Sequence, residues 1–163
     1  MGQGVLVQPG SPGALQRAGT SGCGPCLGVA VTYGSGRQVR ALLAHLQPEA
    51  QQDSVAGQVA EDMPDDFNAE MHIHVTSAPS EDPAQWADQQ ARSEQLVNEI
   101  AARYDWVVFE EGNVHFHQEE SIVVGGRNLE VSTVPVSVMF SHEELEEMRR
   151  AMETDPTAVQ YFK

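Results

Sequence analysis

Two apolar segments on either side of Gly34-Ser35-Gly36 indicate that the first third of the chain folds around a β-hairpin. Residues 27–33 are apolar and rich in β-branched side chains, which favour strands. Glycine and serine between two such segments are typical of a tight turn. Residues 37–46 fit a helix or a strand by pattern alone, but the turn before them favours a strand that returns antiparallel to the first.

The predicted hairpin brings a cysteine and a histidine together. With Ser35-Gly36 as a two-residue turn, Cys26 faces His45, and directly opposed residues have Cβ atoms roughly 4.5–5.5 Å apart. A turn shifted by one residue would move His45 to the other face, unless a bulge restored it. A neutral imidazole can take the proton of a thiol, and the thiolate is a nucleophile. Thr20 is placed to hydrogen-bond to the second ring nitrogen of His45 or to a local backbone group.

The residues just before Cys26 suit a substrate site. Gly22 and Gly24 permit positive φ angles and leave room for a substrate to approach the backbone. Backbone N–H groups in such a turn can also bind an oxyanion. The pattern therefore predicts a cysteine nucleophile in an open turn. A turn with two buried cysteines and a core histidine is the structural alternative.

The segment Thr20-Ser21-Gly22-Cys23-Gly24-Pro25-Cys26 resembles the CheD family pattern, a threonine followed by Gly-x-Gly-x-Cys. In this sequence and in CheD, a strand follows the motif. A histidine flanked by small and apolar residues then comes further along the chain, here in Leu43-Ala44-His45-Leu46. The resemblance covers about residues 20–46, and the Cys–His spacing is slightly longer than is usual for CheD. It implies a catalytic set of Cys26, His45 and Thr20. It also implies a hydrolase that deamidates glutamine side chains exposed on a target protein, without a cofactor.

A second resemblance makes Cys23 a rival nucleophile. Ser21-Gly22-Cys23 is similar to the x-Ser-Gly-Cys motif of the cytotoxic necrotizing factor toxins, which share the Cys–His arrangement. Cys26 is preferred because a strand begins directly after it and because Thr20 lies six residues before it, as in CheD. The divergence from CheD elsewhere favours a secreted effector or toxin over a chemotaxis protein. Without a signal peptide, we expect a cytoplasmic protein or one exported by another system into a target cell.

Three other interpretations of the sequence remain open. Cys23-Gly24-Pro25-Cys26 is also the thioredoxin motif, although there a helix follows the motif and here a β-rich segment does. Two His-x-His pairs on strands, His72/His74 and His115/His117, predict a metal-binding β-rich protein as the main alternative function. The third interpretation is an acidic interaction protein without catalytic activity.

The rest of the chain predicts an α+β fold with a mainly antiparallel sheet or sandwich core and two flanking helices. Strands are expected at 4–7, 71–77, 106–109, 113–117, 122–124 and 129–140, and helices at 83–104 and after the capping box that starts at Ser141. We expect one deamidase-like domain over 1–163, with a flexible segment at 1–19 and a surface excursion at 48–69.

Charge limits the partners. The formal net charge is −15, which repels phosphate backbones and anionic membrane surfaces. No apolar segment approaches the roughly 20 residues of a membrane span. With two cysteines in 163 residues, a disulfide framework is not expected, and a reducing compartment is. We therefore expect a protein substrate and neither a nucleic acid nor a membrane as the partner.

Overall fold

A computed structural model of the chain describes residues 2–8, 16–34, 39–49, 55–57, 61, 71–103, 113–126, 129–135, 140–154 and 159–162. The strands are β1 (Gly2–Val7), β2 (Arg17–Thr20), β3 (Leu27–Tyr33), β4 (Arg40–Leu46), β5 (His72–Thr76), β6 (Val114–His117), β7 (Ile122–Gly125), β8 (Glu130–Ser132) and β9 (Val159–Phe162). The two long helices are α2 (Pro83–Arg103) and α4 (His142–Thr154).

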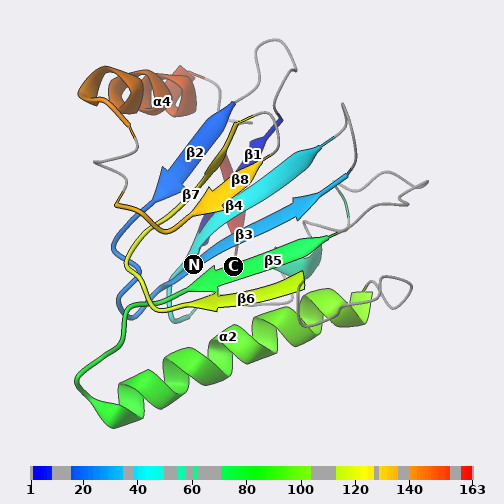
Figure 1. The fold of residues 1–163 in the computed structure, drawn as a ribbon, viewed down its shortest axis with the longest axis vertical. Helices are drawn as coiled ribbons and strands as arrows, with labels where there is room; N and C mark the ends of the chain where they lie inside the picture. The colour runs from blue at the N-terminus through cyan, green and yellow to red at the C-terminus, as the bar shows by residue number, and fades with distance from the viewer. Residues whose placement is uncertain are drawn as a thin grey trace.

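The strands form two sheets (Figure 1). The larger has the order β6-β5-β3-β4-β1-β9 and the smaller the order β2-β7-β8. All pairs are antiparallel except β5 and β6, which are parallel. This confirms the predicted α+β class with a mainly antiparallel core.

The hairpin of β3 and β4 is at the centre of the large sheet, but its register differs from the predicted one. Tyr33 pairs with Arg40 and Gly28 pairs with His45, so residues 34–39 connect the strands and the turn is not the two residues Ser35-Gly36. Cys26 therefore lies outside the ladder and does not face His45. The shift is by two residues, which preserves the side-chain alternation, so His45 stays on the predicted face of the sheet.

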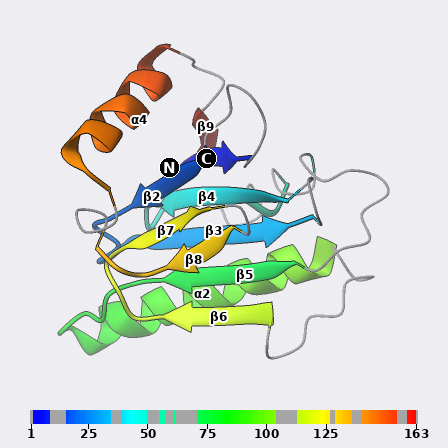
Figure 2. The same cartoon turned by 45° about the horizontal axis from the view of Figure 1, so that its top comes forward.

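The small sheet packs on one face of the large sheet (Figure 2). Alternate residues of the central strands, including Ala30, Ala41 and Leu43, pack there against Ile122 and Val124 of β7. Because opposed residues share a face, the pairs Gly28–His45 and Gly28–Thr76 place His45 and Thr76 on this same face. The small sheet thus covers the side of the central hairpin that bears His45.

Helix α2 packs on the opposite face of the large sheet. Its buried apolar residues Leu96, Val97 and Ile100 contact a core made of Leu27, Val29 and other residues of β3, β4 and β5. The helix begins at Pro83, at the predicted start, after Asp82 accepts a hydrogen bond from the backbone of Ala84. Val55 and Ala56, within the segment 48–69 expected at the surface, are also fully buried in this core.

The C-terminal part of the chain confirms one prediction and corrects another. Helix α4 begins with the predicted capping box, in which Ser141 and Glu144 exchange hydrogen bonds of 2.8 and 3.1 Å. The strand predicted at 129–140 is much shorter, because β8 ends at Ser132. Residues 133–135 are described outside any strand, and Pro135 has no N–H to donate to a ladder. The strand predicted at 106–109 lies outside the described residues. Among the described residues, no helix is long and apolar enough to cross a membrane.

Candidate functional site

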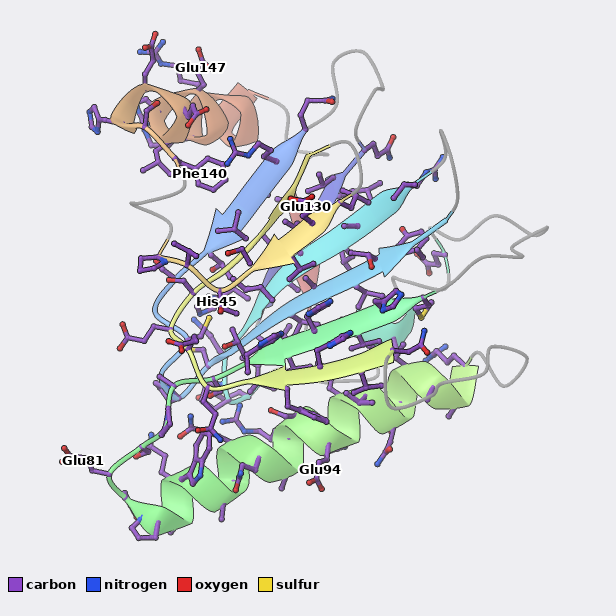
Figure 3. The ribbon with its side chains drawn as sticks, viewed as in Figure 1. His45, Glu81, Glu94, Glu130, Phe140 and Glu147 are labelled. Carbon is purple, nitrogen blue, oxygen red and sulfur yellow. The ribbon has the colours of Figure 1, made fainter. Side chains whose placement is uncertain are left out.

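The predicted site residues gather at one end of the sheets. Thr20 is the last residue of β2, Cys26 immediately precedes β3, and His45 is next to the last residue of β4. The loop from Ser21 to Cys26 crosses from the small sheet to the large one, with Gly22 at a φ angle of 75°. Only glycine adopts this angle readily, so Gly22 lets the chain turn here. Figure 3 labels His45 in this region, where the two sheets meet.

Thr20 and His45 contact each other directly. The Thr20 hydroxyl lies 2.8 Å from His45 Nδ1, although the two residues are 25 positions apart in sequence. When Nδ1 carries the proton and donates it to the hydroxyl, Nε2 keeps its lone pair and can act as a base. Burial lowers the pKa of His45 below its usual value, so the imidazole is neutral at pH 7.

The two thiols lie in different surroundings. Cys23 is completely buried, and its Sγ occupies the space that a side chain at position 28 would need, 2.8 Å from a Cβ built on Gly28. Burial, with repulsion from Cys26 and Glu120, raises the pKa of Cys23 to about 12. Cys26 is partly exposed. Burial raises the pKa of Cys26 too, but the positive charge of Arg92 acts in the opposite direction.

Side chains from outside the predicted motif hold the cysteine loop. The Ser77 hydroxyl donates to the carbonyl of Gly24 at 3.0 Å and to that of Cys26 at 3.2 Å. Gln89 Nε2 of α2 donates to Gly24 O at 2.5 Å. These contacts attach the loop to β5 and α2, so the packing of α2 fixes the conformation of the residues before Cys26.

Arg92 of α2 is the third anchor of the loop. Its Nη2 donates to Pro25 O at 2.6 Å, and its Nε pairs with Asp88 at 2.9 Å. Arg92 is 9% exposed, and its Nη1 has no hydrogen-bond partner in the described part of the chain. A buried N–H without a partner costs free energy, and the positive charge of Arg92 acts to lower the pKa of Cys26. We assign Arg92 to the site as a residue that the sequence motif did not identify.

The anchored carbonyls also determine where the loop's N–H groups point. The carbonyls of Gly24, Pro25 and Cys26 point towards Ser77 and α2. In a trans peptide the N–H of the next residue points the opposite way, and the described backbone has no cis bond. The N–H of Cys26, which follows Pro25 O, therefore points away from α2. A Cβ built at Gly24 meets no atom within 4 Å, so there is open space beside this turn.

The structure does not join all three predicted residues by contacts. Thr20 and His45 are hydrogen-bonded, but in the described part of the chain no hydrogen bond links Cys26 to His45. Catalytic hydrogen bonds are often long without substrate and shorten in its complex. The arrangement supplies a partly exposed thiol, an oriented neutral imidazole and an N–H group that points away from α2.

The four strand histidines also lie together, on the open half of the same sheet face. His74 stacks on His115 with ring centroids 4.2 Å apart, and His72 lies 5.8 Å from His115. His74 Nδ1 is 3.0 Å from His117 Nε2, in rings that are parallel within 3°. We call His72, His74, His115 and His117 the histidine ladder. Among the described residues, no group of three or more His, Cys, Asp or Glu side chains is placed to hold a metal ion.

The thioredoxin-like interpretation of Cys23-Gly24-Pro25-Cys26 finds little support. The motif is followed by strand β3 and not by a helix, whose N-terminus would lower the pKa of the first thiol. Burial instead raises the pKa of that thiol, and both cysteines are free.

Comparisons with known proteins add no assignment to this geometry. No protein-family model matches the sequence, and a search of curated proteins finds no match either. The site is therefore interpreted from its own residues and contacts.

Proposed function

We propose that this protein is a cysteine-dependent protein glutamine deamidase in which Cys26 is the nucleophile, His45 the general base and acid, and Thr20 the residue that orients His45. The hydrogen bond of 2.8 Å between Thr20 and His45 Nδ1 is the observation that most supports the proposal. It joins the two residues that, with Cys26, make up the catalytic set implied by the resemblance to CheD.

Exposure favours Cys26 over Cys23 as the nucleophile. A nucleophile must reach a side chain of another protein, and Cys26 is partly exposed whereas Cys23 is completely buried. The raised pKa of Cys23, about 12, keeps that thiol protonated and unreactive. The thiol of Cys26 is also protonated before reaction, since its pKa is raised as well. A base must therefore remove its proton during attack.

The chemistry balances with the groups present. His45 takes the proton of Cys26 as the sulfur attacks the carboxamide carbon of glutamine, and the N–H of Cys26 is oriented to stabilise the oxyanion. The imidazolium gives its proton to the leaving nitrogen, the C–N bond of the tetrahedral intermediate breaks, and ammonia departs to leave a thioester on Cys26. His45 then deprotonates a water molecule, which attacks the thioester. The C–S bond breaks, the sulfur regains a proton, and the product is glutamate.

Mass spectrometry tests the proposal directly. Glutamine-rich unfolded proteins incubated with the enzyme should gain about 1 Da at each converted glutamine, as an acid replaces an amide. Cys26→Ser should lower the rate by at least about a thousandfold, as loss of a nucleophile does. Cys23→Ala is the matched control and should keep the rate within about tenfold, because it removes only a buried sulfur.

Two results would contradict the proposal in different ways. If Cys23→Ala removes activity while Cys26→Ser keeps it, and both variants fold, the nucleophile is Cys23. If the protein without substitutions converts no glutamine in any of the glutamine-rich unfolded proteins tested, the deamidase assignment is wrong. The substrate should be a protein in a reducing compartment, in the producing cell or in a cell to which the enzyme is exported, since both thiols are free.

A further inference from the structure

A cavity of about 220 Å³ lies beside the cysteine loop, between the first half of α2 and the ends of β5 and β6. Ser77 and Gln89, which hold the carbonyl of Gly24, also line this cavity. The cavity and the nucleophile's loop therefore share two side chains. A ligand in the cavity would therefore lie beside the loop that carries Cys26.

An exposed aromatic side chain marks the outer side of the cavity. Phe116 of β6 is a large apolar side chain and is 55% exposed. Trp86 of α2 lines the same cavity. Among the described strands, β6 is one of the two edges of the large sheet, and a polypeptide can add to a sheet edge as a further strand (Figure 2). The unpaired backbone groups of an edge strand can pair with another chain, and Phe116 and Trp86 place two aromatic side chains beside this edge.

The polar groups of the cavity favour hydrogen-bond donors and positive charge. Among the described residues that line it, none is Lys or Arg, and Glu94 is the one carboxylate. Gln89 is completely buried, and its Oε1 accepts no hydrogen bond in the described part of the chain. A ligand N–H that reached this oxygen would supply its missing hydrogen bond. The net charge of −15 favours a basic partner over the whole surface.

We propose that this cavity and the β6 edge form the docking groove for an extended, basic segment of the target protein that flanks the glutamine. That this segment belongs to a substrate rests on the proposed function. One side chain of the segment enters the cavity between Trp86 and Phe116, and its basic residues lie near Glu94 at the surface of α2 (Figure 3).

Binding is measured in the Cys26→Ser protein, so that the test does not depend on catalysis. The probe is a blocked peptide in which valine and lysine flank a single glutamine, compared with the same peptide carrying glutamate in place of lysine. In isotope-labelled protein, the lysine peptide should shift the NMR signals of the Trp86 indole and the β6 amides. The glutamate peptide should bind at least about tenfold more weakly.

Two surface variants test the groove itself. Phe116→Ser should weaken binding of the lysine peptide by about tenfold, as loss of an aromatic anchor does. Glu94→Lys should also weaken it, by like-charge repulsion, and both residues are exposed, so both variants should fold. The matched control is Val134→Ser, at another exposed apolar residue with 39% exposure, which should leave binding unchanged.

The outcomes separate the two proposals. No binding of the lysine peptide, equal binding of the two peptides, or an unchanged affinity in Phe116→Ser overturns the docking groove, even if the enzyme deamidates proteins. Selective binding at β6 by a protein that converts no glutamine supports the groove as a peptide site and overturns only the proposed function.

Discussion

The large sheet carries histidines at two places on the same face, and their surroundings differ. His45 is a single imidazole with a hydroxyl partner, and the small sheet packs over the strands around it. In the histidine ladder, four imidazoles are stacked, and His74 and His117 use each other as hydrogen-bond partners. The difference shows that the partner of a ring nitrogen, more than the residue type, decides what a histidine can do.

For His45, one ring nitrogen is held by Thr20 and the other can exchange a proton with a substrate. In the ladder, His74 and His117 each use one ring nitrogen to contact the other. A positive charge on one ring of the ladder would also repel a positive charge on its neighbours. Burial and the nearby histidines His115, His117 and His72 lower the pKa of His74 to about 3. The comparison predicts that His45 matters for catalysis and the ladder for stability in acid.

Between the two groups of histidines, the largest effect should come from replacing His45. His45→Ala should lower the deamidation rate by at least about 100-fold, the usual contribution of a general base. His115→Ala is the matched control on the same face and should leave the rate within about threefold, because that ring lies in the ladder. Deamidation followed by mass spectrometry measures both, with circular dichroism to verify folding. If His45→Ala and His115→Ala lower the deamidation rate equally, His45 and the histidine ladder do not differ in their roles.

The next effect concerns stability in acid. The unfolded chain protonates His74 near its ordinary pKa of 6.5, whereas the folded protein does so only near 3. Between these values the unfolded state binds the extra proton, so the free energy of unfolding falls as the pH drops below 6.5, and above 6.5 it is unaffected. The slope for one such group is at most about 1.4 kcal/mol per pH unit, reduced by solvent screening at this half-buried site.

Replacing His74 should therefore reduce the pH dependence of stability. His74→Gln should flatten the free energy of unfolding between pH 6.5 and 4, measured by urea denaturation. His142→Gln, at an exposed position of α4, is the control and should leave the slope as in the original protein. A slope unchanged by His74→Gln would mean that the ladder does not resist protonation.

The sequence predicted some of this arrangement and not the rest, for identifiable reasons. Strand β3 and helix α2 follow directly from apolar periodicity, and the alternation of side chains kept His45 on its predicted face despite the wrong turn. The register was missed because a connection of six residues contains the same glycine signal as a two-residue turn. The pattern did not predict the pairing of β5 with β6 either, since in this parallel pair the partners are 41 positions apart in sequence.

The residues that hold the cysteine loop left a weaker signal. Gln89 and Ser93 interrupt the apolar face of α2 at helical spacing, and such polar positions on a buried face indicate specific partners. The partner itself cannot be read from one sequence, because Pro25 O and Gly24 O meet α2 only after the sheet has formed. The sequence motif therefore predicted candidate reactive groups, while tertiary packing determines which of the two cysteines is exposed.

The smallest effect should come from Thr20, which acts through His45. A hydrogen bond of this kind contributes about 0.5–1.5 kcal/mol, so Thr20→Val should lower the deamidation rate by roughly three- to tenfold. The hydroxyl accepts a stronger hydrogen bond from the imidazolium than from the neutral ring. Its loss should lower the pKa of His45 further below the usual 6.5 and move the acidic limb of the pH–rate profile to lower pH.

The pH profile distinguishes orientation of His45 from a merely structural role of Thr20. Thr20→Ser keeps the hydroxyl and should restore both the rate and the position of the acidic limb, whereas Thr20→Val keeps only the shape. If both variants lower the rate equally without moving the limb, Thr20 supports the packing of β2 against β7 and does not orient His45. If the acidic limb of the pH–rate profile moves in Thr20→Val and not in Thr20→Ser, the Thr20 hydroxyl is the group that distinguishes His45 from the histidines of the ladder.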